Sequence, residues 1–136
     1  MTKAEEFEIL LTRWEDAICE DIGRWRRSIK PVLIHNLKEA RFCTHAVENT
    51  RIQIDGIIGG ANISMLKVWS ILYRRECPDY DGGDEILKII HKLTEENYKW
   101  SLALDDIIFN FRRGAILIED LETRIDEVTP EVYRNE

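Results

Sequence analysis

The chain has 136 residues, of which 44% are hydrophobic and 33% charged, and its net charge is −7. This composition predicts one globular domain over residues 1–136 and excludes a disordered chain, which would have too little apolar surface to bury. The apolar runs are too short for a membrane span, and the acidic N-terminus is not typical of a secretory signal. Three cysteines without such a signal favour a reducing, cytoplasmic location.

The charge is unevenly distributed along the chain. Residues 1–23 carry seven acidic and two basic side chains, residues 24–51 carry two acidic and seven basic ones, and residues 114–136 again carry seven acidic and two basic ones. An acidic chain with a basic middle does not favour sequence-blind binding to nucleic acid, but it leaves room for a local basic patch.

Residues 3–28 are predicted to form the first helix. Thr2 and Glu5 have the spacing of a capping box, and apolar residues then recur every three or four positions. Pro31 is predicted to end this helix and to begin a second one over residues 31–47. The reason is that proline disfavours helical backbone at the residue before it and is tolerated in a first turn.

Residues 51–61 are open to two interpretations. Their first five residues alternate as a strand does, and Gly56, Gly59 and Gly60 are typical of a turn. Helical spacing of the apolar residues also continues across this segment, and no second strand is evident. We therefore prefer a helix that runs to about residue 76, in which the glycines form a small-residue strip that lets another helix approach, with a kink near the last two.

The same helix is predicted to turn Ile63 and Leu66 toward the core, together with Trp69. Residues 77–83, which are rich in proline, aspartate and glycine, are predicted to form a loop.

Residues 84–128 form the stretch around which the rest is expected to pack. Their apolar residues recur at helical spacing, Asn97 is the polar residue within that stripe, and Gly114 is the weakest point. Residues 129–136 are predicted to be a frayed tail. The predicted fold class is therefore all-α, an antiparallel helical bundle of four to five helices around a long C-terminal helix.

Residues with metal-ligating chemistry do not form a recognised motif. Cys43 and His45 lack the spacing of a zinc-binding pair, so neither a metal nor another cofactor is predicted. Clustered carboxylates could hold Mg²⁺, which prefers oxygen ligands, although acidic outward faces are usual on soluble helices. The carboxylates concerned are Glu15, Asp16, Glu20, Asp21, Glu95, Glu96, Asp105, Asp106, Glu119, Asp120 and Glu122.

The basic middle of the chain supplies the candidate binding residues. Their side chains could contact phosphates or the carboxylates of a partner protein, or they could complement acidic helices of the same chain, which is the preferred interpretation. The candidates are Arg24, Arg27, Lys38, Arg41, Arg51, Arg74 and Arg75.

The leading functional hypothesis is a non-enzymatic protein-interaction module (an adaptor, inhibitor or regulatory subunit) that uses a helical face with arginine and tryptophan. Trp14, Trp25, Trp69 and Trp100 fall on the apolar stripes, so burial in the core is expected; any tryptophan that the core leaves outside would be an anchor for a partner. The expected partners are an acidic protein surface and further copies of the chain, without a membrane. The alternatives are a nucleic-acid-binding helical domain that uses the basic 24–51 region and a Mg²⁺-dependent helical nucleotide phosphohydrolase.

Overall fold

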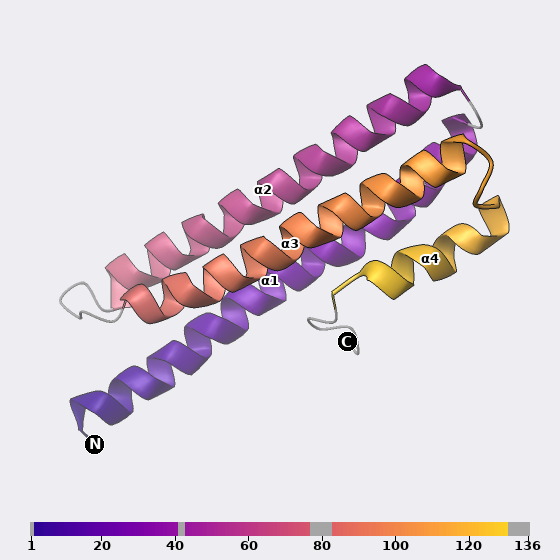
Figure 1. Ribbon diagram of the computed structural model, residues 1–136. Coiled ribbons are helices and arrows are strands. Elements are labelled where there is room, and N and C mark those ends of the chain that lie inside the picture. Colours follow the sequence, from indigo (N-terminus) through magenta and orange to yellow (C-terminus); the bar gives the residue numbers. More distant parts are fainter. Residues whose placement is uncertain (1, 41–42, 77–82, 131–136) are drawn as a thin grey trace.

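Three long helices lie side by side in the computed structural model, and a short fourth helix packs against two of them (Figure 1). The helices are α1 (Lys3–Ala40), α2 (Thr44–Glu76), α3 (Gly83–Arg112) and α4 (Leu121–Val128), with a 3-10 turn at Ile118–Asp120 before α4. The structure describes residues 2–40, 43–76 and 83–130. All regular elements within them are helices, which confirms the all-α prediction.

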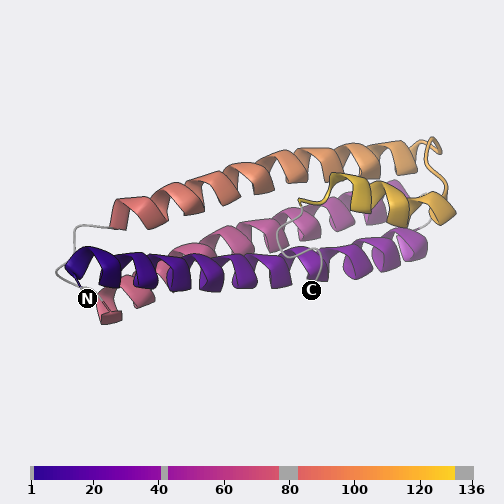
Figure 2. The same cartoon turned by 90° about the horizontal axis from the view of Figure 1, so that it is seen from below.

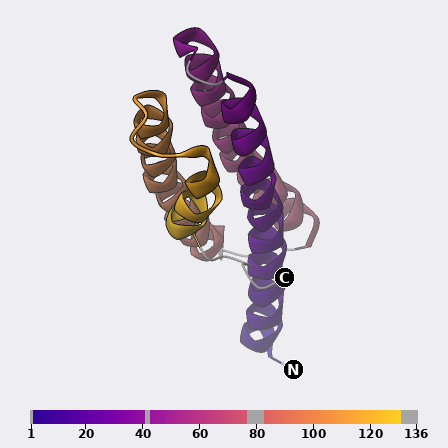
Figure 3. The ribbon, with the colours of Figure 1, turned by 90° about the vertical axis from the view of Figure 1, so that its right-hand side faces the viewer.

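Consecutive helices run in opposite directions (Figures 1 and 2). Side-chain hydrogen bonds fix the alignment of α1 and α2: Ser64 Oγ donates to Asp21 Oδ2 over 2.7 Å, and Asn36 Nδ2 donates to Gln53 Oε1 over 2.8 Å. The short α4 runs back beside α3 and α1, as Figure 3 shows. Within the described residues, no helix combines the length and the apolar character that a membrane span requires.

The predicted boundary at Pro31 is wrong, because α1 continues through this residue to Ala40. The helix predicted over residues 31–47 does not form as a unit: its first part belongs to α1, and its last part belongs to α2, which begins at Thr44.

Burial on both sides of Pro31 explains why the helix continues. Ile29, Leu33 and Leu37 are all buried in the core, whereas Pro31 is exposed. A proline inside a helix costs about 3 kcal/mol, and burial of each aliphatic side chain contributes roughly 1.5–3 kcal/mol. The packing of the apolar stripe therefore outweighs the local cost of the proline.

The helical interpretation of residues 51–61 is confirmed, since the whole segment lies inside α2. Gly60 is where α1 approaches closely: a Cβ atom placed there would lie 3.3 Å from the Trp25 ring. Gly56 and Gly59 have nothing within 4 Å of that position, and they belong to the outward side of α2. The predicted small-residue strip therefore serves helix contact at Gly60 and not at the other two glycines.

The predicted long C-terminal helix over residues 84–128 divides at Gly114, which has a φ of 79°. The Gly114 N–H donates to the Phe111 carbonyl over 3.0 Å, and the Ala115 N–H donates to the Asn110 carbonyl over 2.8 Å. These two bonds form a Schellman motif, which ends a helix at a residue of left-handed conformation. The prediction of a single long C-terminal helix is therefore wrong: α3 ends at Arg112, and the last helix is short.

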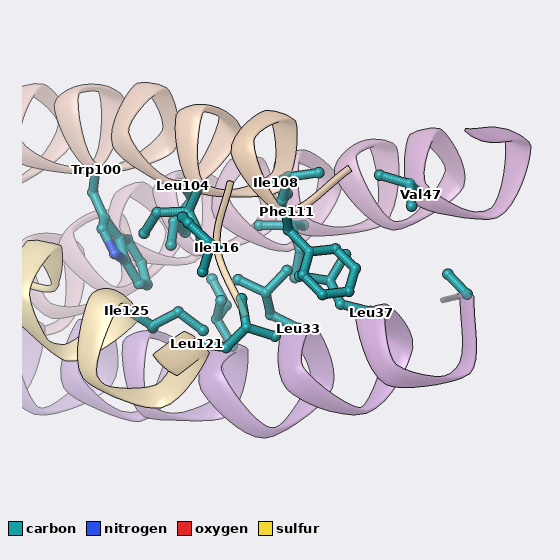
Figure 4. Packing of buried hydrophobic residues seen from close by; sticks show 14 of the residues in the cluster. Leu33, Leu37, Val47, Trp100, Leu104, Ile108, Phe111, Ile116, Leu121 and Ile125 are labelled. Carbon is teal, nitrogen blue, oxygen red and sulfur yellow. The ribbon is translucent and has the colours of Figure 1, made fainter. Parts of the chain in front are cut away.

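The buried apolar residues form two clusters along the length of the bundle. The cluster near the start of α1 comprises Trp14, Ile18, Ile22, Ala61, Met65, Ile86, Ile90 and Leu93. The cluster at the other end, shown in part in Figure 4, comprises Ile29, Leu33, Leu37, Ala40, Val47, Ile54, Ile58, Trp100, Leu104, Ile107, Ile108, Phe111, Ile116, Leu121 and Ile125. Only the second cluster includes residues of α4. Residues 77–82 of the predicted loop and 131–136 of the predicted tail lie outside the described residues.

Candidate functional site

The predicted basic residues do not meet at one place. Arg24, Arg27 and Lys38 are exposed on α1, but Arg24 and Lys38 are 14 positions apart, which is about 21 Å along a helix. Arg24 also lies 3.5 Å from the carboxylate of Asp21, one turn before it. No shared basic pocket is formed by these α1 side chains.

Arg51 lies on a different helix, among carboxylates. Its Nε donates to Glu48 Oε2 over 3.2 Å, and its guanidinium lies 3.7 Å from Asp55. The hydrogen bond to Glu48 raises the pKa of Arg51 above its ordinary value. Arg41 and the side chains of Arg74 and Arg75 lie outside the described part of the chain.

Arg26, which was not among the predicted site residues, is the one arginine that is buried among the described residues, with 3% of its surface exposed. Its Nε donates to Asn97 Oδ1 over 2.9 Å, and Asn97 Nδ2 donates to Asn62 Oδ1 over 2.8 Å. Glu96 lies 3.8 Å from the guanidinium. Burial lowers the pKa of Arg26, and the charge of Glu96 partly offsets this effect.

The Arg26–Asn97–Asn62 chain links α1, α3 and α2, and it lies between the two apolar clusters. We call it the polar layer. Its position, with partners supplied by three helices, is that of a structural element inside the bundle: Arg26 and Asn97 are buried, and Asn62 is partly buried.

Lys30 joins α1 to α4. Its Nζ donates to Asp126 Oδ1 over 3.0 Å and to Glu122 Oε1 over 3.4 Å. The hydrogen bond to Asp126 raises the pKa of Lys30. The basic middle of the chain thus contacts the acidic C-terminal part, as the preferred structural interpretation of the charge pattern predicts.

The candidate magnesium-binding carboxylates are dispersed. Glu15, Glu20 and Asp106 are exposed, and no group of three or more histidine, cysteine, aspartate or glutamate side chains among the described residues could hold a metal ion. Asp105 is half-buried, and its Oδ1 is buried without a hydrogen-bond partner. Burial, and then repulsion from Asp55, raises the pKa of Asp105.

The tryptophans do not provide exposed anchors. Trp14 and Trp100 are buried, while Trp25 and Trp69 are partly buried and pack against the cluster near the start of α1. The expected burial of the tryptophans is therefore found in full for Trp14 and Trp100 and in part for Trp25 and Trp69.

Large apolar side chains are instead exposed on α2 and α3. Each keeps between 46% and 63% of its surface exposed, which is far from the burial that the apolar pattern of these helices would suggest. They are Ile52, Ile63 and Leu66 on α2, and Tyr98, Leu102 and Phe109 on α3. The prediction that Ile63 and Leu66 point inward is wrong, because Ala61 and Met65 occupy the core positions of that turn.

These side chains share one side of the bundle. Contacts between the two helices fix their alignment: Asn62 is level with Asn97, and Glu48 lies 3.5 Å from Arg112. Between these points the outward side of α2 carries exposed residues at helical spacing, and a shallow groove between the helices includes Leu66 and Tyr98. We call this surface the α2/α3 face. It comprises Ile52, Gly56, Gly59, Ile63, Leu66, Tyr98, Leu102 and Phe109.

The α2/α3 face could have been anticipated only in part. A helix with apolar residues on more than one side indicates a second surface that another molecule could cover. On α2, Ile52 and Ile63 lie opposite the buried stripe, which is formed by Ile54, Ile58 and Ala61. Which of the two stripes faces inward depends on the alignment of three helices, and one helix pattern does not determine that alignment.

Comparison of the chain with protein-family models, with curated proteins and with solved structures finds no significant match in any of the three.

Proposed function

We propose that the protein is a non-enzymatic helical interaction module, such as an adaptor, inhibitor or regulatory subunit, and that it binds another protein through the α2/α3 face. The observation that supports this proposal is the gathering of six large, half-exposed apolar side chains on two adjacent helices. Scattered apolar residues are usual on a protein surface, whereas a contiguous patch is typical of an interaction site.

The extent of the patch is consistent with a binding face. Six side chains of this kind, each about half exposed, present on the order of 600 Å² of apolar surface, which is the upper end of the range of about 300–600 Å² for the largest patch on a typical monomeric protein. Tyrosine and phenylalanine are among the residues enriched at protein interfaces, and Tyr98 and Phe109 contribute them here.

The basic side chains support the other hypotheses less well. Arg26 is buried, and Arg24 and Arg51 lie beside carboxylates of their own helices, so fewer cations are available to phosphates than the sequence suggests. Arg27 and Lys38 are both exposed on α1, and in these hypotheses they would contact an acidic partner or a nucleic acid.

A capture experiment with matched variants tests the proposal. The double variant Ile63→Gln/Leu102→Gln makes the α2/α3 face polar, and Ile9→Gln makes the same kind of change at a residue of α1 that is 49% exposed. Each tagged protein is used to capture partners from cells that contain the chain. We expect a specific species that is retained by the wild type and by Ile9→Gln and lost by the double variant.

The opposite pattern contradicts the proposal. If the double variant captures the same species in the same amounts as the wild type, the α2/α3 face is not the binding site. Circular dichroism and the urea midpoint of each variant establish that a lost species reflects a changed surface, because exposed positions should tolerate glutamine without unfolding.

A further inference from the structure

The outward side of α2 carries a symmetric set of residues. Ile52, Gly56, Gly59 and Ile63 follow one another at intervals of four, three and four, and they face away from both neighbouring helices. We propose that this stripe is the contact between two copies of the chain, with α2 of one copy antiparallel to α2 of the other. The inference deepens the proposed function, since it assigns a second copy of the chain to the α2/α3 face.

The spacing is self-complementary. A twofold interface uses the same surface on both copies, so a helix that pairs with itself in the antiparallel direction needs a pattern that reads equally in both directions. The stripe has this property about the midpoint between residues 57 and 58. Ile52 of one copy comes level with Ile63 of the other, and Gly56 comes level with Gly59.

The two glycines allow close approach at the centre of this pairing. A Cβ atom at Gly56 or Gly59 would have nothing within 4 Å, so none of the residues that the structure describes uses the space. Helix axes pack 8–10 Å apart, depending on the side chains at the contact, and glycine gives the short end of that range. The isoleucines on either side then lie against the second helix.

The charges along the stripe fit a second copy. From Glu48 to Lys67, α2 carries two carboxylates and two cations, a net charge of zero in a chain of net charge −7. Two strongly acidic surfaces would repel each other, whereas two copies of this segment do not. Glu48 and Lys67 each lie four residues beyond an isoleucine, so the same pairing brings Lys67 of one copy level with Glu48 of the other, which also pairs with Arg51 and Arg112 of its own chain.

The area is sufficient for a stable dimer. Leu66, Tyr98, Leu102 and Phe109 border the stripe on the α3 side. If about 600 Å² of apolar surface from each copy is covered, the pair buries roughly 1,200 Å², which is above the approximately 1,000 Å² expected of a biological interface.

Sedimentation equilibrium of the intact chain over about 1–200 µM tests the proposal. The wild type should be a dimer in the upper part of this range. The variant Gly56→Gln/Gly59→Gln should dissociate at least tenfold more readily, while its thermal midpoint at low concentration rises, because glutamine is the better helix former and has open space in the monomer. Ile9→Gln, on α1, should leave the dissociation constant unchanged.

A charge exchange gives a second test. Lys67→Glu should weaken the dimer, because it sets a carboxylate level with Glu48 of the other copy, whereas Lys67→Arg, which keeps the charge, should leave the dissociation constant unchanged. A wild type that is monomeric at 200 µM overturns the proposal, as does an unchanged dissociation constant in the double-glutamine variant. If the chain is monomeric and the capture experiment still loses a species on Ile63→Gln/Leu102→Gln, the dimer is wrong and the proposed function stands.

Discussion

At the scale of single residues, Arg26 illustrates how a buried charge is accommodated. Its guanidinium donates to Asn97, lies near Glu96 and has one nitrogen, Nη1, without a hydrogen-bond partner. A buried charge costs free energy, and removal of one member of a buried network costs more, because the remaining partners lose their hydrogen bonds while they stay buried.

We therefore predict that Arg26→Met lowers the free energy of unfolding by about 2–4 kcal/mol, since Asn97 Oδ1 is then left in the core without its donor. The triple variant Arg26→Met/Asn62→Leu/Asn97→Leu, which replaces the whole polar layer by apolar groups, should recover most of this loss. Urea denaturation measures both values. If Arg26→Met is as stable as the wild type, the hydrogen bond between Arg26 and Asn97 contributes nothing to stability.

Asp105 makes stability depend on pH. Its folded-state pKa is raised above the ordinary 3.8, so the ionised carboxylate is less favourable in the folded than in the unfolded protein. As the pH rises from about 3.8 through the raised pKa, the unfolded state loses its proton first, and this residue lowers the free energy of unfolding. Above the raised pKa, the ionised Asp105 carboxylate lowers the free energy of unfolding by its full amount.

We predict that Asp105→Asn raises the thermal midpoint by about 2–5 °C at pH 7 and has little effect near pH 3, where the carboxyl group is protonated in both states. The matched control is Asp106→Asn at the exposed neighbouring position, for which a change of under about 1 °C is expected at either pH. Scanning calorimetry at the two pH values checks the difference. An equal effect at pH 3 and pH 7 would contradict the electrostatic origin.

The sequence contains a partial signal for the polar layer. Asn97 interrupts the apolar stripe of its helix, and Arg26 lies four residues after Ile22 and three before Ile29, so it occupies a core position. Arg24, Arg27 and Lys30 surround Arg26 in the sequence, and a helix end at Pro31 would have placed all of them near an exposed terminus. The burial of Arg26 follows only once α1 is known to be continuous.

At the scale of elements, the helices at 3–28, within 51–76 and from 84 onward were predictable because each has a regular apolar stripe. The helix boundaries were less predictable. Local preferences at Pro31 were overruled by burial of Leu33 and Leu37, whereas at Gly114 the local preference and the packing agree, and the helix ends there.

Pro31 should therefore still reduce stability in the folded protein. Alanine at this exposed position restores the hydrogen bond to the Arg27 carbonyl and removes the ring that crowds it. We predict that Pro31→Ala raises the free energy of unfolding by about 1–3 kcal/mol, as measured by urea denaturation. A decrease in stability would mean that the proline supports the observed course of α1 in a way that alanine does not.

At the scale of the whole molecule, α4 covers one end of the bundle and not the other. Leu121 and Ile125 are buried in the cluster that contains Trp100 and Phe111 (Figure 4), and Lys30 binds α4 through two carboxylates. This docking could not be predicted from the pattern of residues 84–128, which is equally compatible with one long helix. The Schellman turn at Gly114 decides between the two.

We predict that Leu121→Ala lowers the free energy of unfolding by about 3 kcal/mol, because it leaves a cavity beneath α4. Leu117→Ala is the matched control, since Leu117 is 56% exposed, and its effect should be under about 0.5 kcal/mol. Chemical denaturation of both variants tests the prediction. Equal effects would show that α4 does not contribute to the core in solution.

The α2/α3 face also depends on how the whole helices are arranged. The six exposed apolar residues become one surface only when α2 and α3 are aligned, and Arg24, Arg27 and Lys38 fail to become a site because they are spread along α1. Both outcomes depend on the relative placement of helices, which the apolar stripes leave open.

The polar layer restricts how the helices can be positioned along their length. Three helices that met only through apolar stripes could pack with one of them shifted along its axis by a turn, since aliphatic side chains would pack almost as well after the shift. Displacement of any helix past Arg26, Asn62 or Asn97 would set a guanidinium or an amide against hydrocarbon. The polar layer near the middle of the helices thus selects one register among several that apolar packing alone would allow.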